Sequence, residues 1–312
     1  MLTNYHTHHS ICDGKEEAEA YVRAAAWKGF TALGFSSHAP LPFANHWTMQ
    51  AENYPAYCEE IRSLAKLYAG RMEIYLGLEV DFISGEFGRP PYALDGFSAE
   101  SSLSWPTEGL DYYIGAVHVF PVPQGEPGKP DYKPGPAGNP ESCPPPRPAY
   151  REIDHTIEEF EAIRDQNYGG DIQAFVTGYY AYVRELCERF RPPVLAHLDL
   201  IKKNNADGKY FNEEDPWYRD LLRGLVPVIA QSGCIVEVNT GGLARGKTST
   251  VYPSPWILSL LREAGVPIML NADAHRPDTI DSHFDMARDL IRKAGYKSLR
   301  VLRAGGWEET GI

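Results

Sequence analysis

Short apolar runs that each end on a potential metal ligand recur seven times along the 312-residue chain. Each run suits a buried strand, and each leads into a side chain of the kind that binds divalent cations. Ligands at the carboxyl ends of parallel strands converge on one point, which is the active site of a β/α barrel. The pattern therefore indicates a polynuclear metalloenzyme. The seven runs end on His6 and His8, His38, Glu79, His118, His197, Glu237 and Asn239, and Asp273 and His275.

Segments with helical periodicity separate these runs, which is the alternation expected of parallel β/α units. We expect helices over residues 16–29, 49–68, 156–190, 217–232, 255–264 and 284–294. Seven strands and about as many helices predict an α/β fold of the TIM-like barrel type, with the site at the C-terminal ends of the strands. The alternative is a doubly wound open sheet, which would gather its ligands at one switch point.

The length suits one large domain or two small ones, and we expect a single domain over residues 1–312. Residues 121–148 interrupt it, because they are too rich in Pro and Gly for a helix or an interior strand. This segment directly follows His118 and should emerge on the active-site face of the barrel. It is consistent either with an irregular surface insertion or with a loop that shapes access to the site.

Charge and cysteine content exclude several classes of protein. A net charge of -12 argues against a surface built to bind nucleic acid, but not against a small phosphorylated substrate. The five cysteines are scattered and form no C-x-x-C pair, which favours a reduced compartment. We see no signal peptide and no apolar run long enough to span a membrane. We therefore expect a cytoplasmic protein with no membrane partner, and the sequence indicates no particular oligomeric state.

Two pairs of potential ligands share the same spacing. His6 and His8 are two residues apart, so both side chains project from one face of an extended strand. Asp273 and His275 repeat this spacing near the other end of the chain. If the first and last strands close a barrel, the two pairs lie side by side and can hold one cation between them.

The single ligands support the same interpretation jointly. Glu79 ends an apolar strand, where an unpaired carboxylate is costly to bury and a bridge between two metals would remove that cost. Asp81 follows it and is expected to be solvated. Four histidines fall outside the pattern: we expect His9 to point away from the site and His155 to lie on the surface, while His46 and His283 are weaker loop candidates.

A set of motifs in fixed order resembles the PHP (polymerase and histidinol phosphatase) superfamily. These motifs are HTHHSICDG at the start, SSHAP, GLEVD, GAVH, LAHLDLIKK, VEVNTGGL and NADAH. They cover nearly the whole chain apart from the Pro-rich segment. The narrower resemblance is to the monofunctional histidinol-phosphate phosphatases, since position 13 is Asp rather than His.

The resemblance implies a distorted seven-stranded barrel, (β/α)7, with three divalent metal ions. Glu79 would bridge two of them, and Glu79, Asp273 and His275 are the implied catalytic residues. Zinc, manganese and iron all suit such a nitrogen- and oxygen-rich site. The implied ligands are His6, His8, Asp13, His38, Glu79, His118, His197, Asp273 and His275.

The hypothesis for function is hydrolysis of L-histidinol phosphate by a hydroxide held between two metals. Arg184 resembles a phosphate-contacting arginine of that branch, and Arg245 is a second candidate. Glu237 and Asn239 share one face of their strand and are candidates for contacting the amino and imidazole groups. The alternatives are a nucleotide phosphatase or exonuclease, a protein-tyrosine phosphatase, or a binding protein with a decayed metal site.

Overall fold

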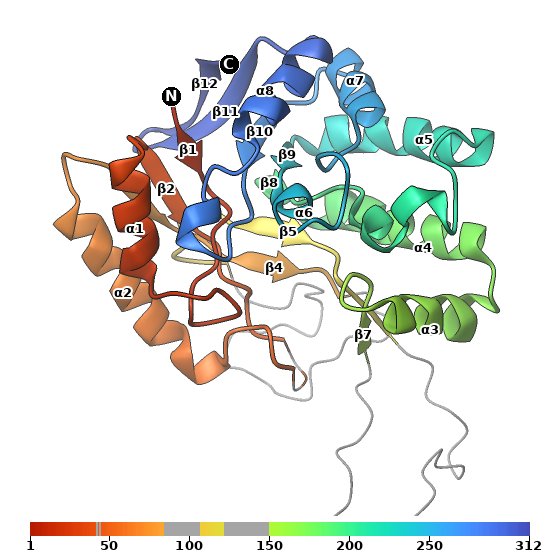
Figure 1. The fold of residues 1–312 in the computed structure, drawn as a ribbon, viewed down its shortest axis with the longest axis horizontal. Coiled ribbons are helices and arrows are strands. Elements are labelled where there is room, and N and C mark those ends of the chain that lie inside the picture. The colour runs from red at the N-terminus through yellow and green to blue at the C-terminus, as the bar shows by residue number, and fades with distance from the viewer. Residues whose placement is uncertain (42, 44, 84–106, 122–149) are drawn as a thin grey trace, which may run out of the picture.

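The computed structural model of the chain describes residues 1–41, 43, 45–83, 107–121 and 150–312. It is an α/β fold with two parallel sheets, and the helices lie around the outside of the strands (Figure 1). One sheet has the order β1-β2-β3 and the other has the order β10-β9-β8-β5-β4. These strands are β1 (Thr3–Asn4), β2 (Ala32–Phe35), β3 (Glu73–Leu76), β4 (Glu79–Asp81), β5 (Ile114–Ala116), β8 (Val194–Leu195), β9 (Ile235–Asn239) and β10 (Ile268–Asn271).

The helices follow the predicted segments closely. In α1, for example, Tyr21, Val22 and Ala25 repeat at helical spacing and are fully buried, and Gly29 ends the helix with a φ of 77°. The α-helices are α1 (Ala18–Trp27), α2 (Tyr54–Leu67), α3 (Ile157–Tyr168), α4 (Ile172–Glu185), α5 (Pro216–Ser232), α6 (Gly241–Ala244), α7 (Pro255–Glu263) and α8 (Phe284–Lys293). Shorter helical turns are η1 (Ala51–Asn53), η2 (Leu186–Phe190), η3 (Leu200–Asn204), η4 (Ala206–Gly208) and η5 (Pro277–Thr279).

The single helix expected over residues 156–190 is wrong. Gly169 and Gly170 both have positive φ, 61° and 86°, which ends α3. Asp171 then begins α4, because its side chain accepts a hydrogen bond from the backbone N–H of Ala174 at 3.0 Å.

The apolar run over residues 73–79 forms two strands instead of one. The break falls at Gly77, where a Cβ atom would lie 2.4 Å from the Tyr112 ring. Tyr112 is buried, and its hydroxyl donates to the backbone oxygens of Tyr5 and Phe35. The chain therefore leaves the first sheet after β3 and enters the second as β4.

Isolated parallel bridges connect the two sheets near the predicted ligands. Thr7 pairs with Ala274, and the His8 N–H donates to the Ala274 carbonyl at 2.9 Å. His38 pairs with Glu79, and the Ala39 N–H donates to the Glu79 carbonyl at 2.8 Å. The bridges place residues from both ends of the chain beside one another.

An apolar cluster draws residues from strands of both sheets. Tyr5, Tyr75, Ile114 and Met269 belong to it, and an antiparallel hairpin that the sequence analysis did not predict packs against it. The hairpin consists of β11 (Ser298–Arg303) and β12 (Gly306–Gly311). The Tyr5 hydroxyl fixes it by donating to the Leu302 carbonyl at 2.8 Å.

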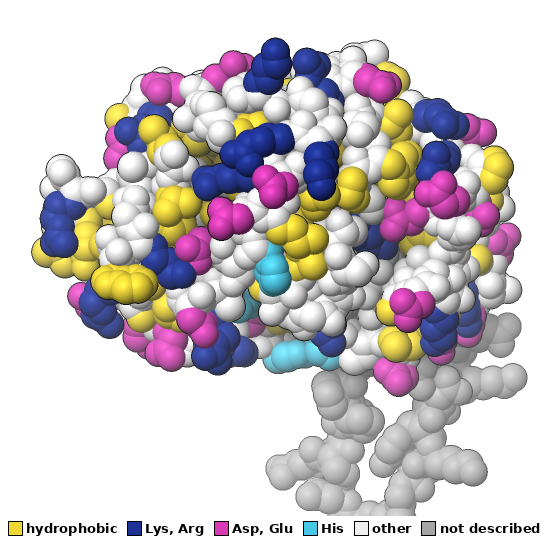
Figure 2. Space-filling view, turned by 45° about the horizontal axis from the view of Figure 1, so that its top comes forward, with side chains coloured by type: hydrophobic (Ala, Val, Ile, Leu, Met, Phe, Trp, Pro, Cys, Tyr) yellow, Lys and Arg dark blue, Asp and Glu magenta, His cyan; other side chains and the backbone are white. Residues whose placement is uncertain are grey.

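A second hairpin flanks the Pro-rich segment. β6 (Val119–Pro121) pairs with β7 (Tyr150–Glu152), so Pro121 ends a strand. Residues 122–148, and the predicted loop they form, lie outside the described residues. No helix in the described part of the chain is long and apolar enough to cross a membrane. On the face drawn in Figure 2, Lys and Arg side chains are interspersed with Asp and Glu.

Candidate metal centre

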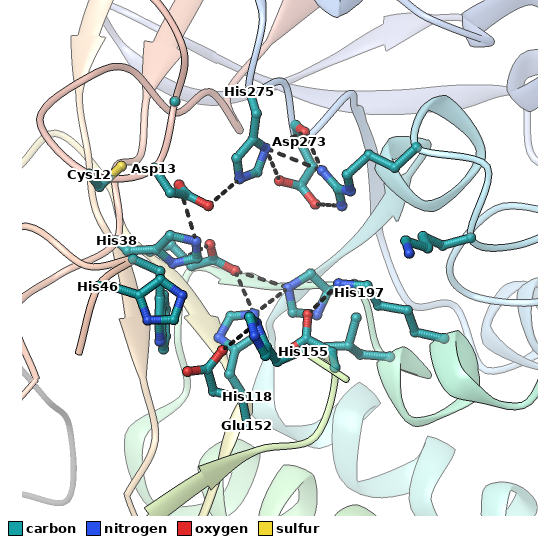
Figure 3. Close-up of a pocket in the computed structure, with 18 of the residues that line it drawn as sticks. Cys12, Asp13, His38, His46, His118, Glu152, His155, His197, Asp273 and His275 are labelled. Carbon is teal, nitrogen blue, oxygen red and sulfur yellow. Dashed lines mark hydrogen bonds and ion pairs between the residues drawn. The ribbon is translucent and has the colours of Figure 1, made fainter. Parts of the chain in front are cut away.

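All nine predicted ligands come together in one cluster. All of them except His6 and His8 line the cavity drawn in Figure 3. Within each of several groups, one candidate ligand atom per residue lies within 4.8 Å of those of the others. These distances are close enough for the members of a group to coordinate a common cation. The groups are His8, Asp13, His38 and His275; His6, His8 and Asp273; Glu79, His118 and His197; and His38, Asp81 and His118.

Glu79 lies at the centre of the cluster and is 1% exposed. Its Oε2 atom is 3.1 Å from His6 Nε2 and 3.1 Å from His38 Nδ1. Its Oε1 atom is 2.9 Å from His197 Nε2 and 3.5 Å from His118 Nε2. Burial favours the neutral acid, but the surrounding imidazoles outweigh it and hold the Glu79 pKa well below its usual range. The two oxygens thus face different sets of nitrogen ligands.

Several buried ligand atoms form no hydrogen bond within the described residues, although His38 Nδ1 lies 3.1 Å from Glu79 Oε2. They are His8 Nε2, His38 Nδ1 and one oxygen of Asp13. In addition, His118 Nε2 and His197 Nε2 face each other at 3.2 Å. Leaving buried polar atoms unpaired is costly, and a cation that accepts their lone pairs removes that cost. The donor set therefore fits divalent metal ions.

Glu237 and Asn239 are not placed to contact a substrate in the cavity, contrary to the expectation from their strand. Both are fully buried in β9 beneath the ligands. Glu237 accepts from the His197 backbone N–H at 3.1 Å and lies 2.6 Å from His6 Nδ1. Burial disfavours a charged imidazole, but Glu237, Glu79 and Asp273 together outweigh it and raise the His6 pKa well above its usual value. Their observed contacts are with predicted ligands: Glu237 with His6 and His197, and Asn239 with Asp273.

Asp81 performs the same task for His118, so the expectation that it is solvated is wrong. It is fully buried, and one oxygen lies 2.9 Å from His118 Nδ1 and 3.1 Å from the His118 backbone N–H. Burial lowers the pKa of His118, but Asp81 and Glu79 more than compensate and raise it to about 10. A carboxylate on Nδ1 leaves Nε2 directed at the centre.

We expect Asp81→Asn to weaken metal binding by about 10- to 100-fold, because the amide no longer carries the charge that orients and polarises His118. Competition with a chelator of known affinity would measure this change. Asp285→Asn, at an exposed position on α8, is the matched control and should bind metal as the parent does. Equal metal affinity in all three proteins would contradict the role given to Asp81.

Arg245 reaches the centre as predicted, whereas Arg184 does not. The Arg245 guanidinium contacts Asp273 Oδ2 at 2.8 Å and His275 Nδ1 at 3.2 Å, and it lines the cavity. Arg184 lies on α4, where it donates to the Gly224 carbonyl at 2.9 Å and pairs with Glu188. It is absent from the cavity lining among the described residues, so its placement does not support a phosphate contact.

The cavity has a volume of about 560 Å³, and part of its lining escaped the sequence analysis. His155 is exposed, as expected, but it also borders the cavity together with Trp47, Glu152 and Asp154. His46, a loop candidate in the sequence, lines it too. The sequence E-x-D-H, directly after the Pro-rich segment, could have indicated that these polar residues lie near the site. His9 stacks on Tyr57 away from the ligands, and His283 precedes α8.

The fold and the site define a class: parallel α/β proteins with a buried, histidine- and carboxylate-rich site suited to divalent cations. The chain belongs to the PHP domain family, whose sequence model matches residues 3–241. This match confirms the predicted superfamily.

Relatives of known name cover nearly the full length. A Deinococcus radiodurans protein named "Probable histidinol-phosphatase" is 28% identical over 303 residues, 96% of this chain and 95% of that protein. A Bacillus subtilis protein named histidinol-phosphatase is 25% identical over 286 residues, 87% of this chain and 92% of that protein. A crystal structure of histidinol phosphate phosphatase from Lactococcus lactis, complexed with Zn, L-histidinol and phosphate, has a TM-score of 0.65 and 19% identity. It covers 98% of both chains.

Proposed function

We propose that this protein is a metal-dependent phosphomonoesterase that hydrolyses L-histidinol phosphate, a reaction of histidine biosynthesis. The observation that carries the proposal is the convergence of buried, unpartnered ligand atoms on one cavity next to Arg245. The choice of substrate rests on the full-length relatives, which are named histidinol-phosphatases.

We assign three cations to the centre, one to each of three ligand groups. His6, His8 and Asp273 form the first group. Glu79 belongs to this group as well, since its Oε2 atom lies next to His6. The second group is Glu79, His118 and His197, and the third is Asp13, His38 and His275. Imidazole and carboxylate ligands suit zinc, manganese or iron.

We also propose that the two sheets form one distorted seven-stranded barrel within a single domain over residues 1–312. The parallel bridges between the sheets support this arrangement, as does the apolar cluster shared by their strands. Counting β3 and β4 as one interrupted strand gives the predicted seven. The broken strand would account for the distortion.

When bound, the cations would supply an activated water and neutralise phosphoryl oxygens. The chain itself contributes Arg245, whose guanidinium lines the cavity beside Asp273 and can donate to a phosphate oxygen. Lys15 and Lys247 also line the cavity and add positive charge near it. Glu79, Asp273 and His275 act by holding the cations in place. Glu237 keeps His6 and His197 oriented, and Asn239 does the same for Asp273.

The test is phosphate release from L-histidinol phosphate, AMP and phosphotyrosine under identical conditions, with manganese or zinc added. We expect kcat/KM for histidinol phosphate to exceed the others at least about a hundredfold, a discrimination that a site fitted to the leaving group can supply. Chelation should abolish the activity. Equal rates on all three substrates, or a preference for AMP, would overturn the assignment of L-histidinol phosphate as the substrate. Either result would point to one of the alternative phosphatase activities.

A further inference from the structure

The cavity has two chemically different ends. Near His275 and Asp273 it is lined by the Arg245 guanidinium, which contacts both residues. In Figure 3, Glu152 and His155 lie at the opposite end, beside His118 and away from His275 and Asp273. A phosphate group belongs at the cationic end, because guanidinium and ammonium groups bind its oxygens. The acidic end is then left for the organic half of the substrate.

Glu152 is held rigidly at that end. It is the last residue of β7, paired with Val119 of β6, and its backbone N–H donates to Glu159 Oε2 at 3.2 Å. Its nearest charged neighbours include another carboxylate, Asp154. Burial and Asp154 together raise the pKa of Glu152 to about 7. A cation placed beside Glu152 would relieve this repulsion.

Lys203, a basic residue that lines the cavity, already has a partner. Lys203 lies 2.6 Å from Asp154, so its charge is balanced by that carboxylate. Among the described residues no Lys or Arg forms an ion pair with Glu152, whose observed partner is His155 Nδ1 at 3.5 Å. The acidic end therefore keeps an excess negative charge that a ligand can neutralise.

Aromatic rings surround the same place. The His46 and His155 rings lie 5.4 Å apart, centre to centre, and nearly perpendicular. The Trp47 ring lies 5.6 Å from the His118 ring, so it connects this end to the metal ligands. Ring faces attract cations and pack against flat heterocycles. The surroundings thus suit a group that is both cationic and attached to an aromatic ring.

We propose that Glu152, flanked by Trp47, His46 and His155, binds the protonated amine of the substrate and so selects phosphate esters of amino alcohols. The inference rests on the proposed function, since it requires the phosphate to lie on the metals and Arg245. It makes Glu152 a specificity-determining residue. Phosphate esters that lack an ammonium group gain nothing from this end of the cavity.

The test compares L-histidinol phosphate with its N-acetyl derivative, in which the ammonium is replaced by a neutral amide, on the parent and on Glu152→Gln. We expect the parent to prefer the amine by about tenfold in kcat/KM, the effect of one charge-assisted hydrogen bond. In Glu152→Gln the KM for the amine should rise by about that factor with little change in kcat. The N-acetyl substrate should not distinguish the two proteins. Glu158→Gln, exposed on α3, is the control and should match the parent.

Calorimetry with L-histidinol, which has no phosphate, provides a readout independent of turnover. Binding to the metal-loaded protein should weaken about tenfold in Glu152→Gln, whereas binding of inorganic phosphate should not change. A parent that hydrolyses both substrates equally, or an equal preference in both proteins, would overturn the inference while leaving the proposed function intact. If the parent hydrolyses neither substrate, the proposed function fails. In that case, an affinity for L-histidinol that is the same in the parent and in Glu152→Gln would overturn the inference as well.

Discussion

Replacing Glu79 with Gln is expected to lower kcat for L-histidinol phosphate by at least about a thousandfold. The neutral amide removes a charge that faces imidazole nitrogens from both the first and the second proposed metal sites. Metal ions contribute several kcal/mol of transition-state stabilisation, and each 1.4 kcal/mol is a factor of ten in rate. Loss of a shared ligand should therefore affect metal content and rate together.

Two measurements separate this effect from misfolding. Metal content by elemental analysis should fall in Glu79→Gln, while the far-UV circular dichroism spectrum stays that of the parent. Glu263→Gln, at an exposed position on α7, is the matched control and should keep its metal and its rate. Full metal content with full activity in Glu79→Gln would show that the carboxylate is not a shared ligand.

Replacing Lys202 with Met is expected to destabilise the protein by about 3–5 kcal/mol, because it strands a buried carboxylate. Lys202 is 6% exposed and Asp199 is fully buried, and their charged atoms are 2.7 Å apart. The ammonium also donates to Ser254 Oγ and to the Val251 carbonyl. This network ties the segment after His197 to the segment that precedes α7.

Urea denaturation at a fixed metal concentration would measure this destabilisation. The exposed Lys66 on α2 provides the control, since Lys66→Met should change the free energy of unfolding by less than about 0.5 kcal/mol. The double variant Lys202→Met/Asp199→Leu should recover much of the loss, because neither charge remains buried. If the double variant is as unstable as the single one, the destabilisation comes from lost packing and not from the unpaired carboxylate.

Periodicity was sufficient to locate most helices, because an apolar face at helical spacing must be buried. It failed at Gly169 and Gly170, where a change in backbone conformation ends α3 although the apolar pattern continues into α4. It also failed at Gly77, since only the tertiary structure shows that the Tyr112 ring fills the space beside this residue. The hairpin of β11 and β12 carries too few apolar residues to predict its place under the strands.

Eight of the nine predicted ligands were visible in the sequence because each ends or follows an apolar strand-like run, and the direction of the strand fixes where the residue lies. Asp13 lies in a turn, and only the family resemblance indicated it. The residues around the ligands were not visible in this way. Asp81, Glu237 and Asn239 are residue types that also serve as ligands or substrate contacts, and they stand at similar positions after apolar residues. In the structure, Asp81 bonds to His118, and Glu237 bonds to His6 and to the backbone of His197. Asn239 donates to Glu237 and Asp273. Whether a polar residue can coordinate a metal or instead orients a ligand depends on how deeply its side chain lies in the core, and packing determines that depth.

The sequence alone determined the family, the alternation of strands and helices, and the set of side chains gathered at the strand ends. These are properties of local pattern and chain direction. The tertiary structure alone decided that Arg245 rather than Arg184 reaches the cavity, and that Glu152 and His155 line its acidic end. Both outcomes depend on how distant segments pack against each other, because side chains on loops and helix surfaces acquire their neighbours only when the chain has folded.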